Sequence, residues 1–376
     1  MAKLGDIATY INGYPFKPND WSDTGLPIIR IQDLTGNSYQ ANRYKGEYQP
    51  KYEVNAGDVL ISWSASLGVY IWQGEKALLN QHIFKVVFNK EAVSKDFFVF
   101  QVEQILKKAA QDVHGATMKH LTKPVFDALP FYLPSYEEQC NIANKLKYVR
   151  SIIEQRQEQL TKLDELVKAR FVEMFGDPKL NPYRFPCNSL STYITFLTSG
   201  SRGWSQYFTD SGEYFITIKN VKNCKITLQD VQYVAPPDNA EAKRTKVQKN
   251  DLLISITADL GRTGVVTEEI ANHGAYINQH LTCIRLKDEQ VNPLYVAYYM
   301  ESDAGKEQFT AKNQSAVKAG LNFNAINSLK LMAPPLSLQN QFADFVAEVD
   351  KSKADVQKAL DQTQLLFDSL MQQYFG

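Results

Sequence analysis

The sequence predicts an α+β protein built from two tandem copies of one unit, each a globular α/β part followed by a long helix. Short motifs recur at a slowly changing spacing along the 376 residues. Strand-like runs and a short helical run fill the first part of each copy, and a long apolar stripe fills the second. We expect the two long helices to pair antiparallel as a coiled-coil spacer, with pseudo-twofold symmetry between the copies.

The duplication is clearest in the run Asn-Gln-His, which occurs at 80–82 and again at 278–280. The run VNAGDVLIS at 54–62 likewise matches VQKNDLLIS at 247–255. The spacing between matching residues is 187 near the start of the copies, 193 and 198 in the middle, and 200 toward the end. A drifting offset is typical of a duplicated domain that has gained loop insertions.

Each copy begins with a globular part, expected over 1–136 and 178–336. Runs rich in β-branched and aromatic residues predict strands there, and one amphipathic run in each copy predicts a helix. The expected strands are 27–31, 59–62, 83–88, 214–218, 252–256 and 281–286, and the expected helices are 97–108 and 294–300.

A long helix follows in each copy, expected over 137–177 and 337–376. Both begin after a proline, in LPSYEEQ and APPLSLQ, and Ser135 with Glu138 has the spacing of a capping box. Apolar residues then recur at alternating four- and three-residue steps, as in a coiled-coil seam. The alternative is that each helix lies on its own globular part without pairing. The stripe includes Ile142, Leu146, Val149, Ile153, Leu160, Leu163 and Val167, and Phe342, Val346, Val349, Val356, Leu360 and Phe367.

Composition argues against several functions. Basic and acidic residues number 41 each, which disfavours a protein that holds polyanions by bulk charge. The start has no signal-peptide pattern, and no segment approaches the roughly 18 apolar residues of a membrane span, so we expect a cytoplasmic protein. Cysteine and histidine spacings predict no metal site. No GxxxxGK[ST] motif predicts an ATP site, and no methyltransferase motif is present.

One run superficially resembles the carboxylates and lysine of restriction nucleases, namely Asp238, Glu241 and Lys243. In nucleases these groups come from separate strands, whereas here they fall within one short loop beside two prolines. We therefore expect the chain to be non-catalytic.

The order of parts, with GDVLIS, LNQHI, HGATMKHLT, LPSYEEQ and MFGDP in sequence, resembles the specificity subunit of type I restriction-modification systems over the whole chain. The resemblance implies two target-recognition domains, each reading one half of a bipartite, asymmetric DNA site. It also implies that the long helices separate these domains and dock methyltransferase subunits. A coiled-coil adaptor that binds proteins instead of DNA is the alternative.

The partners implied by this resemblance are double-stranded DNA, two methyltransferase subunits and, in the full complex, restriction subunits. S-adenosylmethionine, ATP and Mg²⁺ would belong to those subunits, and no cofactor is expected on this chain. Contacts with the methyltransferase subunits are expected along the helix stripe, at Ile142, Leu146, Val149, Leu160, Phe342, Val346, Val356 and Leu360.

Two domains that read different half-sites owe the difference to residues they do not share. The shared Asn-Gln-His runs are therefore interpreted as a structural turn or as common phosphate contacts. DNA contacts are expected in loops where the copies differ, at side chains able to reach base edges or phosphates. For each, an ordinary exposed loop residue is the alternative. They are Lys17, Ser64, Ser66, Lys119 and His120 in the first domain, and Arg202, Thr257, Asp259, Arg262 and Lys318 in the second.

Overall fold

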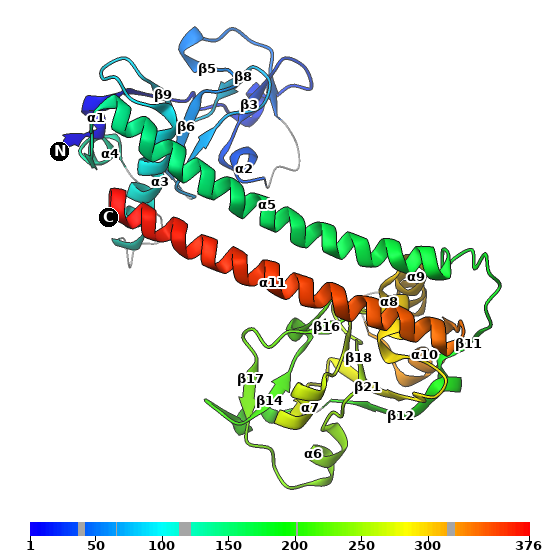
Figure 1. Cartoon of the computed structure of the whole chain (residues 1–376). Helices are drawn as coiled ribbons and strands as arrows, with labels where there is room; N and C mark the ends of the chain where they lie inside the picture. The colour runs from blue at the N-terminus through cyan, green and yellow to red at the C-terminus, as the bar shows by residue number, and fades with distance from the viewer. Residues whose placement is uncertain (37–41, 65, 113–121, 201, 314–319) are drawn as a thin grey trace. The chain divides into compact units, whose positions relative to one another are not determined.

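The computed structural model describes residues 1–36, 42–64, 66–112, 122–200, 202–313 and 320–376. The chain divides into two compact units, each made of a globular α/β part and segments of both long helices (Figure 1). Unit 1 comprises Met1–Glu158 and Gln357–Gly376, and unit 2 comprises Gln159–Val356. The limits of the units fall inside the helices, whereas the domain limits expected from the sequence fall at the helix ends.

Two four-stranded sheets form the globular part of unit 1. The first is antiparallel in the order β2-β9-β6-β7, with strands Thr9–Asn12, Ile83–Val87, Val59–Ser62 and Gly68–Ile71. The second has the order β4-β3-β8-β5, with strands Arg43–Tyr44, Leu26–Ile29, Ala77–Leu79 and Glu53–Val54. Its central strands β3 and β8 are parallel. Every residue of β6 and β8 is buried, so these strands form the interior of the two sheets.

The core of unit 1 is rich in phenylalanine. Helix α3 (Lys95–Asp112) packs beside the first sheet, and Phe97 and Phe98 at its start are fully buried. Phe84 of β9 and Phe131 join them in the same cluster, because alternate side chains of β9 point to the helix side of the sheet. The side chains of this cluster bury large apolar areas, and burial of each contributes roughly 1.5–3 kcal/mol.

Unit 2 repeats the first sheet strand for strand and three strands of the second, whose fourth strand lies at the opposite edge, beside β17 (Gln232–Val234) in unit 2 and beside β8 in unit 1. The first has the order β12-β21-β18-β19, with strands Ile194–Ser199, Leu281–Leu286, Leu252–Ser255 and Thr263–Val265. The second has the order β13-β17-β14-β20, with strands Phe208–Thr209, Gln232–Val234, Glu213–Ile216 and Ala275–Ile277, and β14 is parallel to β20. Helix α8 (Pro293–Glu301) follows β21 as α3 follows β9. The shared topology confirms the duplication predicted from the motifs.

Shorter elements complete the two units. In unit 1 they are β1 (Ala2–Lys3), which pairs with β10 (Pro130–Phe131), and helices α1 (Leu4–Ile7), α2 (Ile31–Leu34) and α4 (Lys123–Asp127). In unit 2 they are β11 (Cys187–Ser189) paired with β22 (Lys330–Met332), β15 (Val221–Lys222) paired with β16 (Lys225–Ile226), and helices α6 (Ala240–Thr245), α7 (Glu268–His273), α9 (Asp303–Lys312) and α10 (Phe323–Asn327).

The two long helices are α5 (Tyr136–Phe175) and α11 (Leu336–Phe375), each of 40 residues. At the start of α5 the Glu138 amide donates to the Ser135 hydroxyl at 3.3 Å. The Glu138 carboxylate instead accepts a hydrogen bond from the Tyr132 hydroxyl at 3.3 Å. The expected capping box is therefore only half formed, because Tyr132 competes for the carboxylate.

A buried glutamine fixes the start of each long helix. The Gln139 side-chain oxygen accepts from the Ser94 amide at 2.9 Å, just before α3 begins. The Gln339 side-chain oxygen accepts from the Asn292 amide at 2.8 Å, just before α8 begins. Each glutamine also donates to the carbonyl of the proline five residues earlier, at 3.0 and 2.7 Å. Both glutamines are nearly inaccessible, so an unpaired amide there would be costly.

Within unit 2, segments of α5 and α11 pack against each other in opposite directions. Phe171 meets Phe342 edge to face with ring centroids 5.3 Å apart, and Asp164 pairs with Lys353. The earlier residue of α5, Asp164, thus contacts the later residue of α11, Lys353, so the two segments are antiparallel. In unit 1, the first half of α5 and the last part of α11 share the core of that unit. Antiparallel pairing is confirmed within unit 2, and the alternative of helices without pairing is wrong.

Candidate nucleic-acid interface

The turns that follow β6 and β18 have the same support. The Ser62 hydroxyl donates to the Ser66 carbonyl, and the equivalent Ser255 hydroxyl donates to the Asp259 carbonyl. Both serines are fully buried, so the two units build the same turn from a shared residue. The side chains on these turns differ, with Trp63, Ser64 and Ser66 in unit 1 and Ile256, Thr257 and Asp259 in unit 2.

In unit 2 this turn orders two polar side chains. Thr257 Oγ1 lies 2.6 Å from His280 Nδ1, so the histidine of the second Asn-Gln-His run fixes the threonine. Arg262 Nε donates to the Asp259 carboxylate at 2.5 Å, and the arginine side chain is 36% exposed. An arginine held by a carboxylate on one side presents its other donors in a fixed direction. This arrangement suits recognition of a base edge.

In unit 1 the same turn is supported by an aromatic ring. The Trp63 indole donates to the Asn12 side-chain oxygen at 3.2 Å and stacks on Phe84 with ring centroids 5.6 Å apart. Trp63 thus supports the turn from the sheet side. Ser66 and Lys17 are exposed, and Ser64 is half-buried.

The two Asn-Gln-His runs form the turns that lead into β9 and β21. A Cβ atom at Gly13 would overlap the Asn80 carbonyl, and one at Gly200 would overlap the Asn278 carbonyl. Only glycine permits so close an approach of two backbone segments. The interpretation as a structural turn is confirmed. The interpretation as phosphate contacts stays a prediction.

Three predicted DNA contacts, Lys119, His120 and Lys318, lie outside the described residues. Arg202 is exposed, two residues before the buried Trp204. Trp204 is 3% exposed and belongs to the core of unit 2.

The nuclease-like run lies on the surface of unit 2. Lys243 Nζ is 3.0 Å from the Asp238 carboxylate, and the two side chains are 75% and 89% exposed. Among the described residues, no group of three or more His, Cys, Asp or Glu side chains is placed to hold a metal ion. An exposed ion pair of this kind contributes little to stability.

Much of the apolar stripe of the long helices lies in the protein's own cores, which corrects the prediction of partner contact at the buried positions. Five of the eight named residues are buried in the unit cores, namely Ile142, Leu146, Val149, Phe342 and Val346. The other three, Leu160, Val356 and Leu360, are half-buried. A paired helix buries its seam against its neighbour, so the five buried side chains are not available to a third chain, whereas partner contact at Leu160, Val356 and Leu360 stays a prediction. The exposed apolar side chains of α5 and α11 are Tyr136, Tyr148, Leu166, Val172, Leu365 and Leu366.

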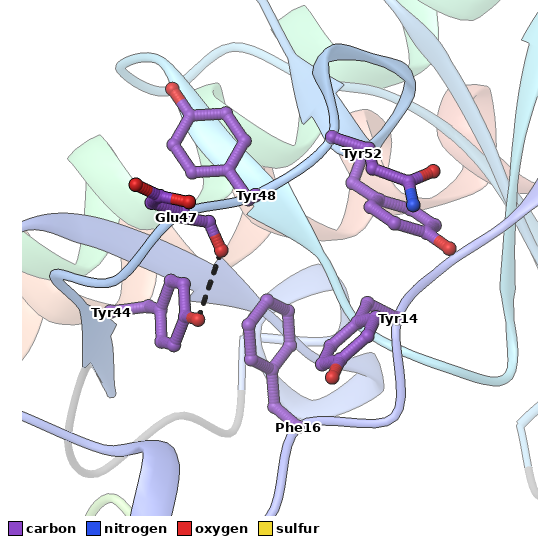
Figure 2. A pocket seen from close by; sticks show the side chains of 7 residues that line it. Tyr14, Phe16, Tyr44, Glu47, Tyr48 and Tyr52 are labelled. Carbon is purple, nitrogen blue, oxygen red and sulfur yellow. Dashed lines mark hydrogen bonds between the residues drawn. The ribbon is translucent and has the colours of Figure 1, made fainter.

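Unit 1 contains an aromatic cavity of about 340 Å³ whose lining was not among the predicted site residues (Figure 2). Its rings meet edge to face, with centroids 4.9 Å apart for Tyr14 and Phe16 and 5.6 Å apart for Tyr14 and Tyr52. The tyrosines at 44, 48 and 52 recur every fourth residue, which is the signal that could have revealed it. The cavity is lined by Tyr14, Phe16, Tyr44, Glu47, Tyr48, Gln49 and Tyr52.

A charged group fixes one wall of this cavity. Lys76 Nζ lies 2.8 Å from the Glu53 carboxylate, and the Tyr48 hydroxyl donates to the same carboxylate at 2.9 Å. The hydrogen bonds from Lys76 and Tyr48 lower the pKa of Glu53. The bond to Glu53 in turn raises the pKa of Tyr48, so the phenol stays protonated and holds its position.

Comparisons with known proteins agree with these features. A family model described as the type I restriction modification DNA specificity domain matches residues 1–162 and 205–363. The EcoBI specificity subunit of Escherichia coli is 22% identical, with 99% of this chain and 84% of the relative covered. The MjaVIII specificity subunit of Methanocaldococcus jannaschii is 20% identical, with 96% and 89% covered.

Two solved structures share the fold. One, from work on complex assembly and conformational transition of the type I R-M system, has a TM-score of 0.60 at 15% identity and covers 100% of this chain and 96% of that one. The other, the S subunit of a type I restriction-modification system from M. genitalium, has a TM-score of 0.55 at 14% identity, with 100% and 95% covered. In the described part of the chain, no helix has the length and apolar character to cross a bilayer. The chain belongs to the type I restriction-modification DNA specificity family and recognises DNA sequence.

Proposed function

We propose that this chain is the DNA-recognition subunit of a type I restriction-modification complex, in which each unit reads one half of a bipartite, asymmetric site. One observation carries the proposal. Both units have the same first sheet in the same strand order, yet the equivalent turns after its strands β6 and β18 present different side chains. A shared sheet supports a shared way of approaching DNA. Different side chains on the turns support recognition of different DNA sequences.

In unit 2 the side chain best placed to read a base is Arg262. Its guanidinium is held by Asp259 and remains partly exposed, and arginine is well suited to guanine O6 and N7 in the major groove. Asp259 then acts as a positioning residue. Thr257, fixed by His280, serves as a further base or backbone contact. Arg202 is proposed as another contact, because it is exposed on a loop that differs between the units.

In unit 1 the proposed contacts are Lys17, Ser64 and Ser66, which lie on loops that differ from their unit 2 counterparts. Lys119, His120 and Lys318 complete the proposed set from the sequence pattern alone. Residues 1–136 carry 14 basic and 13 acidic side chains, and residues 179–336 carry 17 and 14. With so little excess positive charge, most phosphate neutralisation would come from partner subunits.

The proposed partners are two methyltransferase subunits and, in the full complex, restriction subunits. We place methyltransferase docking on the outer faces of α5 and α11, where apolar side chains such as Tyr148 and Leu365 are exposed (69% and 70%). S-adenosylmethionine, ATP and Mg²⁺ would be bound by those subunits. This chain would then be non-catalytic and would act in the cytoplasm, where its DNA and partners are.

The decisive experiment compares the methylome of the host with and without this gene. Loss of one bipartite motif on deletion, and its return on complementation, is the expected result. The comparison requires an active methyltransferase partner, which is checked by expressing the two genes together in a host without the motif. An unchanged methylome under that condition would favour the protein-binding adaptor instead.

A further inference from the structure

The aromatic cavity of unit 1 has no role in the contacts assigned so far. Four rings follow one another around it, because Tyr44 also meets Phe16 edge to face with centroids 5.0 Å apart. Tyr14 is 42% exposed, although large aromatic side chains usually bury most of their surface. The cavity therefore presents ring surfaces that the described residues do not cover completely.

The corresponding place in unit 2 is built differently. In unit 1, Phe16 packs with Ile28 and Leu78, which are paired residues of the parallel strands β3 and β8. In unit 2, the paired residues of the parallel strands β14 and β20 are Phe215 and Tyr276.

Trp204 covers that pair in unit 2. Its ring stacks on Phe215 at 5.6 Å and lies 5.2 Å from Tyr276. All three rings are buried, at 3–5% exposure. At the same position of a duplicated scaffold, one unit thus has a buried aromatic cluster and the other has an open aromatic cavity. Because the units differ here, the cavity is a candidate for specificity toward one half-site only.

The charges around the cavity favour nucleic acid over a cationic ligand. Lys17, Lys45 and Lys51 are exposed and adjoin the lining residues in sequence, and Lys51 Nζ already lies 4.9 Å from the Tyr52 ring centroid. These lysines would repel a cationic side chain but would attract phosphates. Glu47 is the one acidic residue of the lining.

We propose that this cavity receives a nucleobase turned out of the duplex at the half-site read by unit 1. The inference rests on the proposed function and adds a binding site to it. Stacking on aromatic side chains contributes about 1–3 kcal/mol per base, which offsets much of the cost of unpairing. Polar groups in the lining, at Gln49, the Glu47 carboxylate and the hydroxyls of Tyr14 and Tyr52, are available to bond the base edge, whereas the Tyr44 and Tyr48 hydroxyls already donate to the Glu47 carbonyl and to Glu53. The flanking lysines would hold the adjoining phosphates.

The test uses the chain assembled with its methyltransferase partner and the target site identified from the methylome. Duplexes carry an abasic nucleotide opposite each position of the site in turn, and the affinity of the complex for each is measured. Removing the partner base lowers the cost of turning a base out, so affinity should rise about tenfold at that position. The methylated base of each half-site is expected to show this rise, because methyltransferases also extrude their target base, and it serves as the positive control.

The cavity predicts one additional position at which an abasic nucleotide in the opposite strand raises the affinity, and this position lies in the half-site of unit 1. Tyr52→Ala and Tyr14→Ala should abolish that additional rise and weaken binding to the intact site about tenfold. Tyr52→Phe keeps the ring and should keep the rise. Phe208→Ala, at an exposed aromatic residue of the corresponding sheet in unit 2, is the matched control and should change neither.

Two results would overturn the inference. One is a bipartite site that shows a rise only at the methylated bases, which leaves the proposed function standing. The other is an additional rise that persists in both alanine variants. Loss of methyltransferase co-purification in these variants, without loss of the additional rise, would assign the cavity to a protein partner. Failure of the proposed function is distinct, since no bipartite motif would then exist.

Discussion

The Asp259 carboxylate accepts a hydrogen bond from Arg262 Nε at 2.5 Å, across the turn that follows β18. Asp259 itself is anchored, because its carbonyl accepts from the buried Ser255 hydroxyl. The chain of contacts runs from the interior of the sheet to a partly exposed guanidinium. In unit 1 the equivalent serine supports the same turn without an arginine.

Arg262→Ala should therefore relax recognition at one position of the half-site read by unit 2. A good bidentate arginine contact discriminates against a wrong base by about 1–3 kcal/mol, so variant sites should become methylated. Methylome sequencing of cells that express the variant is the measurement. The half-site of unit 1 should keep its stringency and is the internal control. Equal weakening on all sequences would show that Arg262 contacts a phosphate.

Neighbouring residues of α11 should separate folding from partner docking. Phe367 is 7% exposed, and its ring lies with that of Phe100 around the Arg150 guanidinium. Phe367→Ala should lower the free energy of unfolding by about 3–5 kcal/mol, because it leaves a cavity. Leu365 is 70% exposed, so Leu365→Glu should leave stability nearly unchanged and reduce co-purification of the methyltransferase subunit.

The measurements are denaturant unfolding and affinity pull-down of the co-expressed subunits. Lys358→Glu, a change of charge elsewhere on the exposed surface of α11, is the control for charge alone. Normal assembly with Leu365→Glu would contradict docking at this position.

The fold could be predicted from the sequence because its signals are periodic and duplicated. Residues 59–62, 252–255 and 281–286 are strands within a residue or two of the expected ranges, and α5 and α11 begin one residue earlier than expected. Repetition of a pattern in both copies makes each instance a check on the other. Pairing of β3 with β8 joins residues about fifty apart, so no local pattern could reveal it.

The site was less predictable, for two physical reasons. An apolar stripe indicates that one face of a helix is covered, but it does not say by what, so Leu146 was assigned to a partner although it lies in the core. The aromatic cavity joins Tyr14 to Tyr52 through the tertiary fold, and neither residue stands in a known motif. The shared histidines lie in a turn as predicted, yet no sequence pattern indicates the hydrogen bond between His280 and Thr257.

Two buried thiols should make the stability of unit 2 depend on pH. Burial, with added repulsion from nearby carboxylates, raises the pKa of both Cys224 and Cys283. A raised folded pKa means that stability is fully present below the unfolded thiol pKa of about 8.5 and is lost as pH rises above it. Between pH 7 and pH 10, each buried thiol should lower the free energy of unfolding by about 2 kcal/mol.

Unfolding in guanidinium at both pH values measures this loss. In the Cys224→Ala and Cys283→Ala variants, the free energy of unfolding should differ less between the two pH values. Each variant is compared with itself, so the stability lost by replacing cysteine with the smaller alanine cancels. The exposed Cys187 should react with maleimide in the native protein, whereas the buried Cys224 and Cys283 should react only on unfolding. An equal loss in wild type and variants would assign the pH dependence to other groups.

Gly13 and Gly200 provide a matched pair that tests whether the two units act separately. Each packs against the carbonyl of the asparagine in its own Asn-Gln-His turn, where a Cβ atom would overlap backbone atoms. Because a backbone carbonyl cannot move aside as a side chain can, either substitution by alanine should displace the turn, at a cost of about 1–3 kcal/mol. Gly13→Ala should then impair recognition of the half-site of unit 1 alone, and Gly200→Ala that of unit 2 alone.

Binding of the assembled complex to duplexes with one half-site scrambled at a time distinguishes the two. Gly68→Ala is the control, because its nearest atoms belong to the Tyr70 ring, which can rotate away. If either variant weakened both half-sites equally, the units would not read DNA independently.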